Sequence, residues 1–391
     1  MNIFLLSLFG IFFSLFIYVY FCLPYINNYQ NHQLYEYKRK KIFLLINFII
    51  LFYLVYASLG AFQFIETDRL IAIEKANDLP RYKLYYKIAT ECSSFKEALN
   101  KLSLEPLFTF LYYACGKISK SFSFFLFLFY SFNFISWYIF LKRICIKFNI
   151  ITAFSFFSLI FSQYLMSFCL LRMGVAISIG LWVYIFLIDK KIYKALVSII
   201  LAVLVHNSSI FLFFPFFLYI IYLKKGIKKM FFGFLIFFIL GFLLSSILPT
   251  ILPLIARRYL AYMNGTGVAV STYLTNAFFI LLIYIKRKTF FNDEVDYILF
   301  VFLLSSLFIL DLQLVISMFY RMIYFTQPAL FVVIGKVFSE YKLEKKHMER
   351  NLIIRLFIIF YLFFYYYKFS TGVWEALDLI DYRLDFNFFN F

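Results

Sequence analysis

Long apolar runs separated by short charged clusters dominate the pattern of hydrophobic and polar positions along the chain. A helix that crosses a bilayer needs about 20 mostly apolar residues. The run 104–118 is apolar but short, so we expect a re-entrant or interfacial helix there. The expected fold is all-α: a polytopic integral membrane protein with a single transmembrane domain over residues 1–391. About twelve transmembrane helices are predicted, over residues 3–24, 42–64, 122–141, 150–171, 173–188, 195–206, 209–223, 230–248, 272–285, 297–312, 314–335 and 351–367.

The basic clusters predict the orientation of these helices, because cytoplasmic loops carry an excess of Lys and Arg. If the 104–118 segment does not cross, all the clusters fall on one side: 38–41, 142–147, 190–194, 224–229, 286–288 and 336–350. The loops on that side hold 22 Lys and Arg against 8 Asp and Glu, whereas the other side holds 15 against 12. We therefore expect both termini on the outer face, together with three outer segments: a large loop at 65–121, a second loop at 249–271 and the tail 368–391.

Composition supports the membrane class and argues against other classes. Hydrophobic residues make up 64% of the chain and charged residues 15%, whereas soluble domains carry roughly 25% charged residues. The net charge of +18 is spread over short cytoplasmic loops, so no nucleic-acid partner is expected. The five cysteines form no CxxC pair, and no metal or other cofactor is expected. No Lys or Arg precedes the first apolar run, which we interpret as a transmembrane helix and not a leader.

Two ionisable residues lie at the expected outer ends of apolar runs, where burial in lipid is costly. Arg172 is either a snorkelling residue at a helix end or an anion clamp suited to phosphate. His206 is either a helix-end residue or a proton acceptor. Gly174 and Ser178 form a small-xxx-small pair, which predicts a close helix contact that holds Arg172 in place.

A second polar group is predicted around the outer turn between the runs 297–312 and 314–335. Asp311 and Arg321 flank this turn and could pair with each other. Tyr320, Tyr324 and Gln327 accompany Arg321 as candidate substrate contacts. On one helix these side chains would form a polar stripe that must face protein or water.

The outer loops contain further charged candidates. Glu105 precedes Pro106, a pattern typical of a helix start, and its carboxylate is also a possible site group. Asp68 lies close after the second apolar run, and Arg257 and Arg258 lie in the loop 249–271. Cations with a candidate base on one face of the membrane suit a phosphate-bearing lipid as ligand. No nucleotide loop or nucleophile elbow is present, so the expected chemistry is electrostatic stabilisation with proton transfer.

The stretch from Arg172 through the basic turn at 189–194 to His206-Asn-Ser-Ser resembles the central block of the EpsG family. These are Wzy-like polysaccharide polymerases of bacterial exopolysaccharide, capsule and O-antigen clusters. The Glu105-Pro106 pair, Asp68 and Arg321-Met-Ile-Tyr are also similar to the family. Gly174 departs from the pattern by replacing a common polar residue, and the run Glu66-Thr67-Asp68-Arg69 lacks the usual Gly and aromatic neighbours.

The resemblance implies a fold like that of GT-C membrane glycosyltransferases and a metal-independent reaction at the outer face of the bacterial plasma membrane. A glycan chain would pass from undecaprenyl pyrophosphate to the acceptor sugar of another lipid-linked unit, with a chain-length regulator as a possible partner. The implied pyrophosphate ligands are Arg172 and Arg321, with Arg257 and Arg258 as further candidates. The implied base is His206, Asp68 or Glu105. A flippase for lipid-linked sugars, or an outer-face ligase or transferase, remains an alternative.

Overall fold

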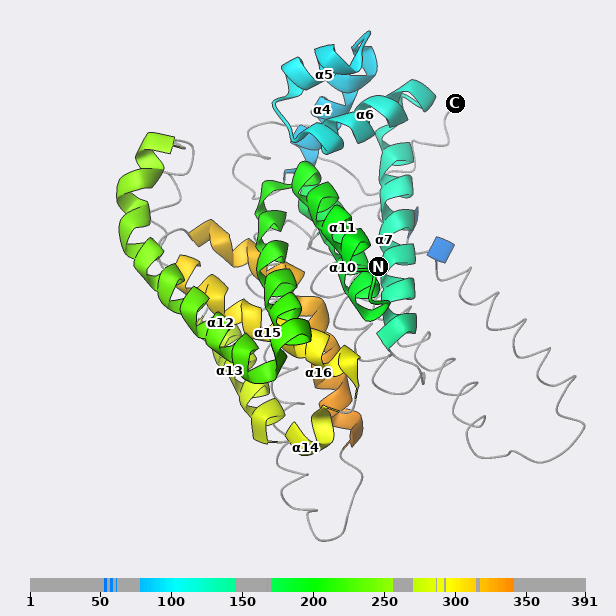
Figure 1. Cartoon of the computed structure of the whole chain (residues 1–391). Coiled ribbons are helices and arrows are strands. Elements are labelled where there is room, and N and C mark those ends of the chain that lie inside the picture. Colours follow the sequence, from blue (N-terminus) through cyan, green and yellow to red (C-terminus); the bar gives the residue numbers. More distant parts are fainter. Residues whose placement is uncertain are drawn as a thin grey trace, which may run out of the picture. The chain divides into compact units, whose positions relative to one another are not determined.

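The computed structural model describes residues 53–54, 57–58, 61, 78–144, 167, 170–255, 270–285, 287–291, 293–313 and 317–340 (Figure 1). All regular secondary structure in these ranges is helical. The chain divides into two compact units, one formed by Met1–Ser178 with Tyr341–Phe391 and the other by Ile179–Glu340. The boundary falls inside helix α10 (Leu171–Ile188).

Three short helices form a cluster at one end of the first unit: α4 (Leu79–Glu91), α5 (Phe95–Leu102) and α6 (Pro106–Ile118). They pack against one another, and α4 and α6 also contact α7 (Phe122–Ile144). Figure 1 shows the cluster at one end of α7, with α6 running across the axis of that long helix. Glu105 is the N-cap of α6 and Pro106 its first residue, as the sequence predicts. With 13 residues, α6 is too short to cross a bilayer as a straight helix.

An aromatic core joins the cluster to α7. The rings of Tyr86 and Tyr112 meet edge to face at 5.4 Å between centroids, and Tyr112 lies 4.7 Å from Phe125 of α7. Such aromatic pairs contribute about 0.5–1.5 kcal/mol each beyond the area they bury. A polar contact adds to this core, because Lys117 Nζ of α6 donates to the carbonyl of Cys92 at 2.7 Å. The three short helices therefore form one packed layer.

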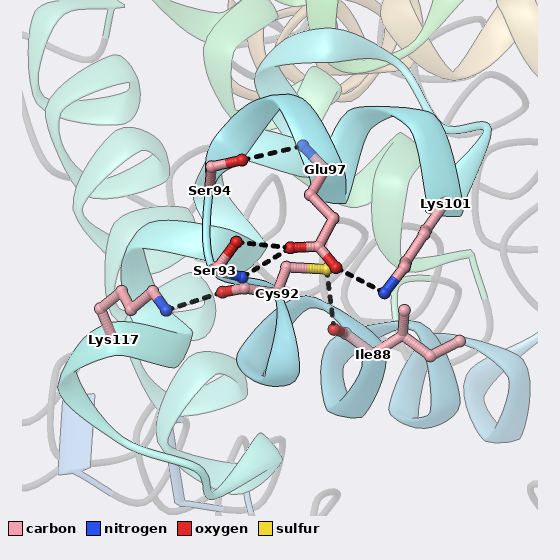
Figure 2. Close-up of polar contacts among 7 residues, drawn as sticks. All are labelled: Ile88, Cys92, Ser93, Ser94, Glu97, Lys101 and Lys117. Carbon is pink, nitrogen blue, oxygen red and sulfur yellow. Dashed lines mark hydrogen bonds and ion pairs between the residues drawn. The ribbon is translucent and has the colours of Figure 1, made fainter.

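The start of α5 is fixed by a variant of the capping box, in which Glu97 reaches back to the amide of Ser93, one residue before the N-cap Ser94 (Figure 2). Ser94 Oγ accepts a hydrogen bond from the Glu97 amide at 3.2 Å, as an N-cap does. The Glu97 carboxylate accepts from the amide and the hydroxyl of Ser93, both at 2.8 Å, and from Lys101 Nζ at 2.6 Å. The hydrogen bonds from Lys101 and Ser93 lower the pKa of Glu97 to about 2. The turn between α4 and α5 is thus held by groups that are mostly exposed.

The second unit is built around α15 (Glu294–Gln313). Residues 298–304 of α15 are all buried, which is typical of a helix surrounded on every side. The helix packs against α12 (Phe213–Ile255), α13 (Val270–Ile285) and α16 (Gln327–Glu340), and against the 3₁₀ helix η5 (Ser317–Phe325). The remaining elements are α11 (Ile192–Val205), the 3₁₀ helix η3 (Asn207–Leu212) and the short α14 (Arg287–Phe290).

Helix α12 turns back on itself at Gly226, whose φ of 77° and ψ of 176° interrupt the helix. An L side chain is strained at this φ, so glycine suits the turn. The break separates the predicted runs 209–223 and 230–248, and exposed lysines surround it at 224–225 and 228–229. Beyond the turn, Phe232, Ile239 and Phe242 are each at least half exposed. A row of exposed apolar side chains on one helix suits contact with lipid.

Three helical stretches among the described residues are long and apolar enough to cross a membrane: Phe122–Ile144, Leu171–Ile188 and Asn207–Leu243. They coincide with predicted runs, and they indicate a membrane protein. The predicted runs 3–24, 150–171 and 351–367 lie almost wholly outside the described residues, so the total of about twelve stays a prediction.

The prediction of one continuous helix over 314–335 is wrong. The described part of this segment forms η5 first, then a turn at Thr326, and only then α16. Residues three apart eclipse in a 3₁₀ helix, so Arg321 and Tyr324 share a face of η5. Gln327 instead begins the next helix. The predicted polar stripe is therefore divided between two elements.

Candidate functional site

Arg172 lies in the first turn of α10, where it reaches two of the short helices. Its Nη1 donates to Glu105 Oε2 at 2.7 Å, and its Nε donates to the Tyr82 hydroxyl at 3.0 Å. The guanidinium also lies 5.7 Å from the centroid of the Tyr82 ring. Arg172 thus binds both Glu105, the N-cap of α6, and Tyr82 on the buried face of α4.

Burial strengthens this ion pair relative to one in water. The Arg172 side chain is 26% exposed and that of Glu105 is 10% exposed. Burial raises the pKa of Tyr82, and the positive charge of Arg172 partly offsets that effect. A guanidinium has five N–H donors, and the two printed contacts use two of them. Three donors therefore remain for another acceptor, as far as the described residues show.

A second tyrosine, Tyr112 of α6, has an unusual environment. Tyr112 is fully buried, and its hydroxyl has no hydrogen-bond partner among the described residues. Burial raises its pKa well above the usual value, while the charges of Tyr82 and Arg172 also act on it. Leaving a buried hydroxyl unsatisfied costs about 1–3 kcal/mol. The hydroxyl of Tyr112 is therefore a feature that packing alone does not explain.

Close packing behind Arg172 fixes the start of α10. A Cβ atom on Gly174 would lie 2.8 Å from Ser167 Cβ and 2.9 Å from Phe129 Cζ, so a larger residue cannot fit without a shift. One turn further along, Asn133 Nδ2 donates to Ser178 Oγ at 2.7 Å. The predicted small-xxx-small contact is confirmed, and it joins α10 to α7. The close approach of Ser167 and Phe129 accounts for a glycine at position 174.

The second unit holds His206 between α11 and η3. The His206 amide donates to the Ala202 carbonyl at 2.9 Å, and its carbonyl accepts from the Ser209 amide at 2.9 Å. Helix η3 packs against η5, the element that carries Arg321 and Tyr324. Gly180 of α10 lies where the two 3₁₀ helices end, because its Cβ position is 3.4 Å from Phe325 and 3.5 Å from Leu212.

Several polar atoms near these two 3₁₀ helices are buried without a hydrogen-bond partner in the described part of the chain. They are Ser208 Oγ, Ser209 Oγ and Gln327 Oε1. Ser209 is fully buried and Gln327 is 7% exposed. Buried polar groups of this kind normally bind ordered water or a ligand. Both small hydroxyls and an amide can bond to water or to the hydroxyls of a sugar.

The structure brings Arg172 and Glu105 together in the first unit and, separately, packs the elements of His206 and Arg321 in the second. Asp68, Arg257 and Arg258 lie outside the described residues, as do the side chains of Tyr320 and Asp311. Tyr82, Tyr112 and Ser209 were not singled out from the sequence, and their contacts and burial make them further candidates. Nowhere in the described ranges do three or more His, Cys, Asp or Glu side chains gather as a metal site.

The apolar spanning helices and the paired cation at a helix end define a polytopic membrane protein with a candidate anion site. Residues 70–383 match the model of the EpsG family. The match covers most of the 391 residues, so the chain belongs to the EpsG family, which is related to Wzy-like exopolysaccharide polymerases. The resemblance seen in the sequence is thereby confirmed at the level of the family. No curated protein and no solved structure matches the chain.

Proposed function

We propose that this chain polymerises lipid-linked oligosaccharide repeat units at the outer face of the bacterial plasma membrane. Membership of the EpsG family supports the class of reaction. The observation that carries the site assignment is the ion pair between Arg172 and Glu105, within the matched residues. It provides a cation with donors to spare at the end of an apolar helix. Such a cation suits the phosphate of a lipid headgroup.

In the proposed reaction, a hydroxyl oxygen of the acceptor sugar attacks the anomeric carbon of the donor chain. The bond between that carbon and the pyrophosphate oxygen breaks, and undecaprenyl pyrophosphate leaves with the electron pair. Arg172 and Arg321, with Arg257 and Arg258 as further candidates, stabilise the charge that develops on the leaving group. Tyr324 and Gln327, with Tyr320, contact the rest of the substrate.

The proton of the acceptor hydroxyl must pass to a base. An ion pair favours the charged form of a carboxylate and makes it a weaker base. We therefore assign Glu105 to holding Arg172 in position, and we assign proton transfer to His206 or Asp68. His206 suits the role because an imidazole nitrogen can accept a proton.

The distribution of Lys and Arg supports a site on the outer face of the membrane and an orientation with both termini outside.

The test uses Arg172→Ala and His206→Ala in a strain that makes the cognate glycan. We expect both variants to lose long polymer while lipid-linked single units accumulate on the outer face. Normal polymer from either variant would refute that residue's assignment. Units that accumulate on the inner face after loss of the protein would instead indicate a flippase. A gel that shows no long polymer in the parent strain, but one added sugar or one transferred chain, would indicate a transferase or ligase.

A further inference from the structure

Among the described residues, hydrogen-bond donors outnumber acceptors around Arg172. The Tyr82 hydroxyl oxygen accepts from Arg172 Nε, so its own O–H remains a donor, and no acceptor for it is found in the described ranges. The Tyr112 hydroxyl is also without a partner there. Glu105 is the carboxylate that the guanidinium contacts. A set of unused donors beside a cation favours an anionic oxygen as ligand.

The surroundings of Tyr112 exclude a simple packing role for its hydroxyl. Its ring lies among other aromatic rings, with the ring centroids of Phe108 and Phe125 at 4.6 Å and 4.7 Å from its own. A phenylalanine would fill the same volume without burying an unsatisfied oxygen. Arg172 is the most exposed member of the cluster, so a ligand of the tyrosines would have to approach from the side of the guanidinium.

We propose that the hydroxyls of Tyr82 and Tyr112 donate hydrogen bonds to a phosphate-bearing ligand that Arg172 binds. The ligand class is a phosphate or pyrophosphate ester, held by a charged fork and two phenols in a mostly apolar setting. That the ester is the leaving group of a polymerase rests on the proposed function. The anion site itself rests only on the contacts around Arg172.

The chain offers a matched pair of variants for the test. Tyr86 and Tyr112 are both buried and touch each other edge to face, but the Tyr86 hydroxyl donates to the Ser119 carbonyl at 2.7 Å. Tyr86→Phe therefore removes a satisfied hydrogen bond and should lower the melting temperature. Tyr112→Phe removes an unsatisfied oxygen and should leave the melting temperature equal or higher.

The full-length protein in detergent or nanodiscs is titrated with inorganic pyrophosphate while its melting temperature is followed. We expect the wild type and Tyr86→Phe to gain the same increment, because neither lacks a donor in the site. Tyr112→Phe should bind about tenfold more weakly, as expected for loss of a hydrogen bond to a charged group. Tyr82→Phe should weaken binding as well. The proposal is overturned if Tyr112→Phe keeps the full increment, if Tyr86→Phe loses it equally, or if the wild type shows none.

A second arm separates the sources of the anion. Farnesyl pyrophosphate is titrated beside inorganic pyrophosphate, and tighter binding of the lipid ester assigns the site to a lipid headgroup. Equal binding of the two assigns it to the phosphate group alone, with the same two tyrosines as donors. A protein that binds pyrophosphate through Tyr112 but makes no polymer would refute the proposed function and leave the anion site standing.

Discussion

The two candidate regions differ in how their polar groups are satisfied. At the start of α10, Arg172 is already bound by Glu105 and Tyr82, and Gly174 packs tightly behind it. At the two 3₁₀ helices of the second unit, buried polar atoms such as Ser209 Oγ have no hydrogen-bond partner in the described part of the chain. The first region is held by a charged pair, whereas the second holds buried polar atoms without partners among the described residues. We therefore expect loss of the Arg172 and Glu105 pair, or of the packing behind it, to affect stability and activity together. Changes in the second region should affect activity alone.

The largest loss of stability should come from breaking the ion pair between Arg172 and Glu105. Glu105→Ala leaves the guanidinium of Arg172 without its carboxylate in a partly buried position, and one-sided loss of a fully buried pair costs about 3–5 kcal/mol. Because Arg172 is 26% exposed, we expect about 1–3 kcal/mol, measured by chemical or thermal unfolding. Glu97→Ala is the matched control, because the Glu97 and Lys101 pair lies at the exposed surface. Equal losses in the two variants would contradict the account.

Gly174→Ala should have the next largest effect. Its new Cβ would lie 2.8 Å from Ser167 Cβ and 2.9 Å from Phe129 Cζ, so either α10 or these neighbours must shift, at about 1–3 kcal/mol. Gly180→Ala is the control, because its Cβ would meet nothing closer than 3.4 Å. That variant should be neutral or slightly more stable, since alanine favours a helix over glycine by about 1 kcal/mol. The reverse order of melting temperatures would be incompatible with the packing described.

Ser209→Ala should lower activity without lowering stability. One lost hydrogen bond to water or ligand is worth about 0.5–1.5 kcal/mol, so polymer yield should fall about three- to tenfold. Ser305→Ala is the control, because Ser305 is also fully buried but its hydroxyl donates to the Val301 carbonyl at 2.7 Å. Product length on a gel and the melting temperature are compared. Full activity in Ser209→Ala would remove this region from the site.

The smallest effect concerns pH. The pKa of Glu97 is lowered to about 2 from a usual value of 4.5, so folding favours the ionised carboxylate. Its contribution to stability is complete above about pH 4.5 and is lost as pH falls toward 2. Glu97→Gln should abolish that part of the acid dependence, measured as melting temperature between pH 2 and pH 6. If the melting temperature of Glu97→Gln fell with pH as much as that of the wild type, Glu97 would not be the source of this acid dependence.

Much of the fold could be predicted from the sequence, because apolar length and capping residues act locally. The runs at 122–141 and 173–188, the basic turn before the second limb of α12 and the helix start at Pro106 are all observed. The helices α4 and α5 were missed inside the expected outer loop 65–121. The signals were present in the capping box of Ser94 and Glu97 and in the spacing of Leu79, Tyr82 and Tyr86.

The partners within the site could not be predicted in the same way. Arg172 and Glu105 were both candidates, but 67 residues separate them in sequence, and only tertiary packing joins them. Tyr82 is 90 residues from Arg172 and resembles many other tyrosines in an aromatic-rich chain. The break between η5 and α16 was also missed, although Thr326 and Pro328 form a helix-start signal within the run 314–335. Long-range contacts and changes of helix type decide these features.

The most direct test uses the purified protein and lipid-linked repeat units extracted from cells that lack it. Wild-type protein in nanodiscs is incubated with these units, and the products are separated by length. We predict a ladder of polymers from the wild type, single units only from Arg172→Ala, and a ladder from Gly180→Ala. The account is contradicted if the wild type leaves the units unjoined, or if Arg172→Ala extends them as far as the wild type does.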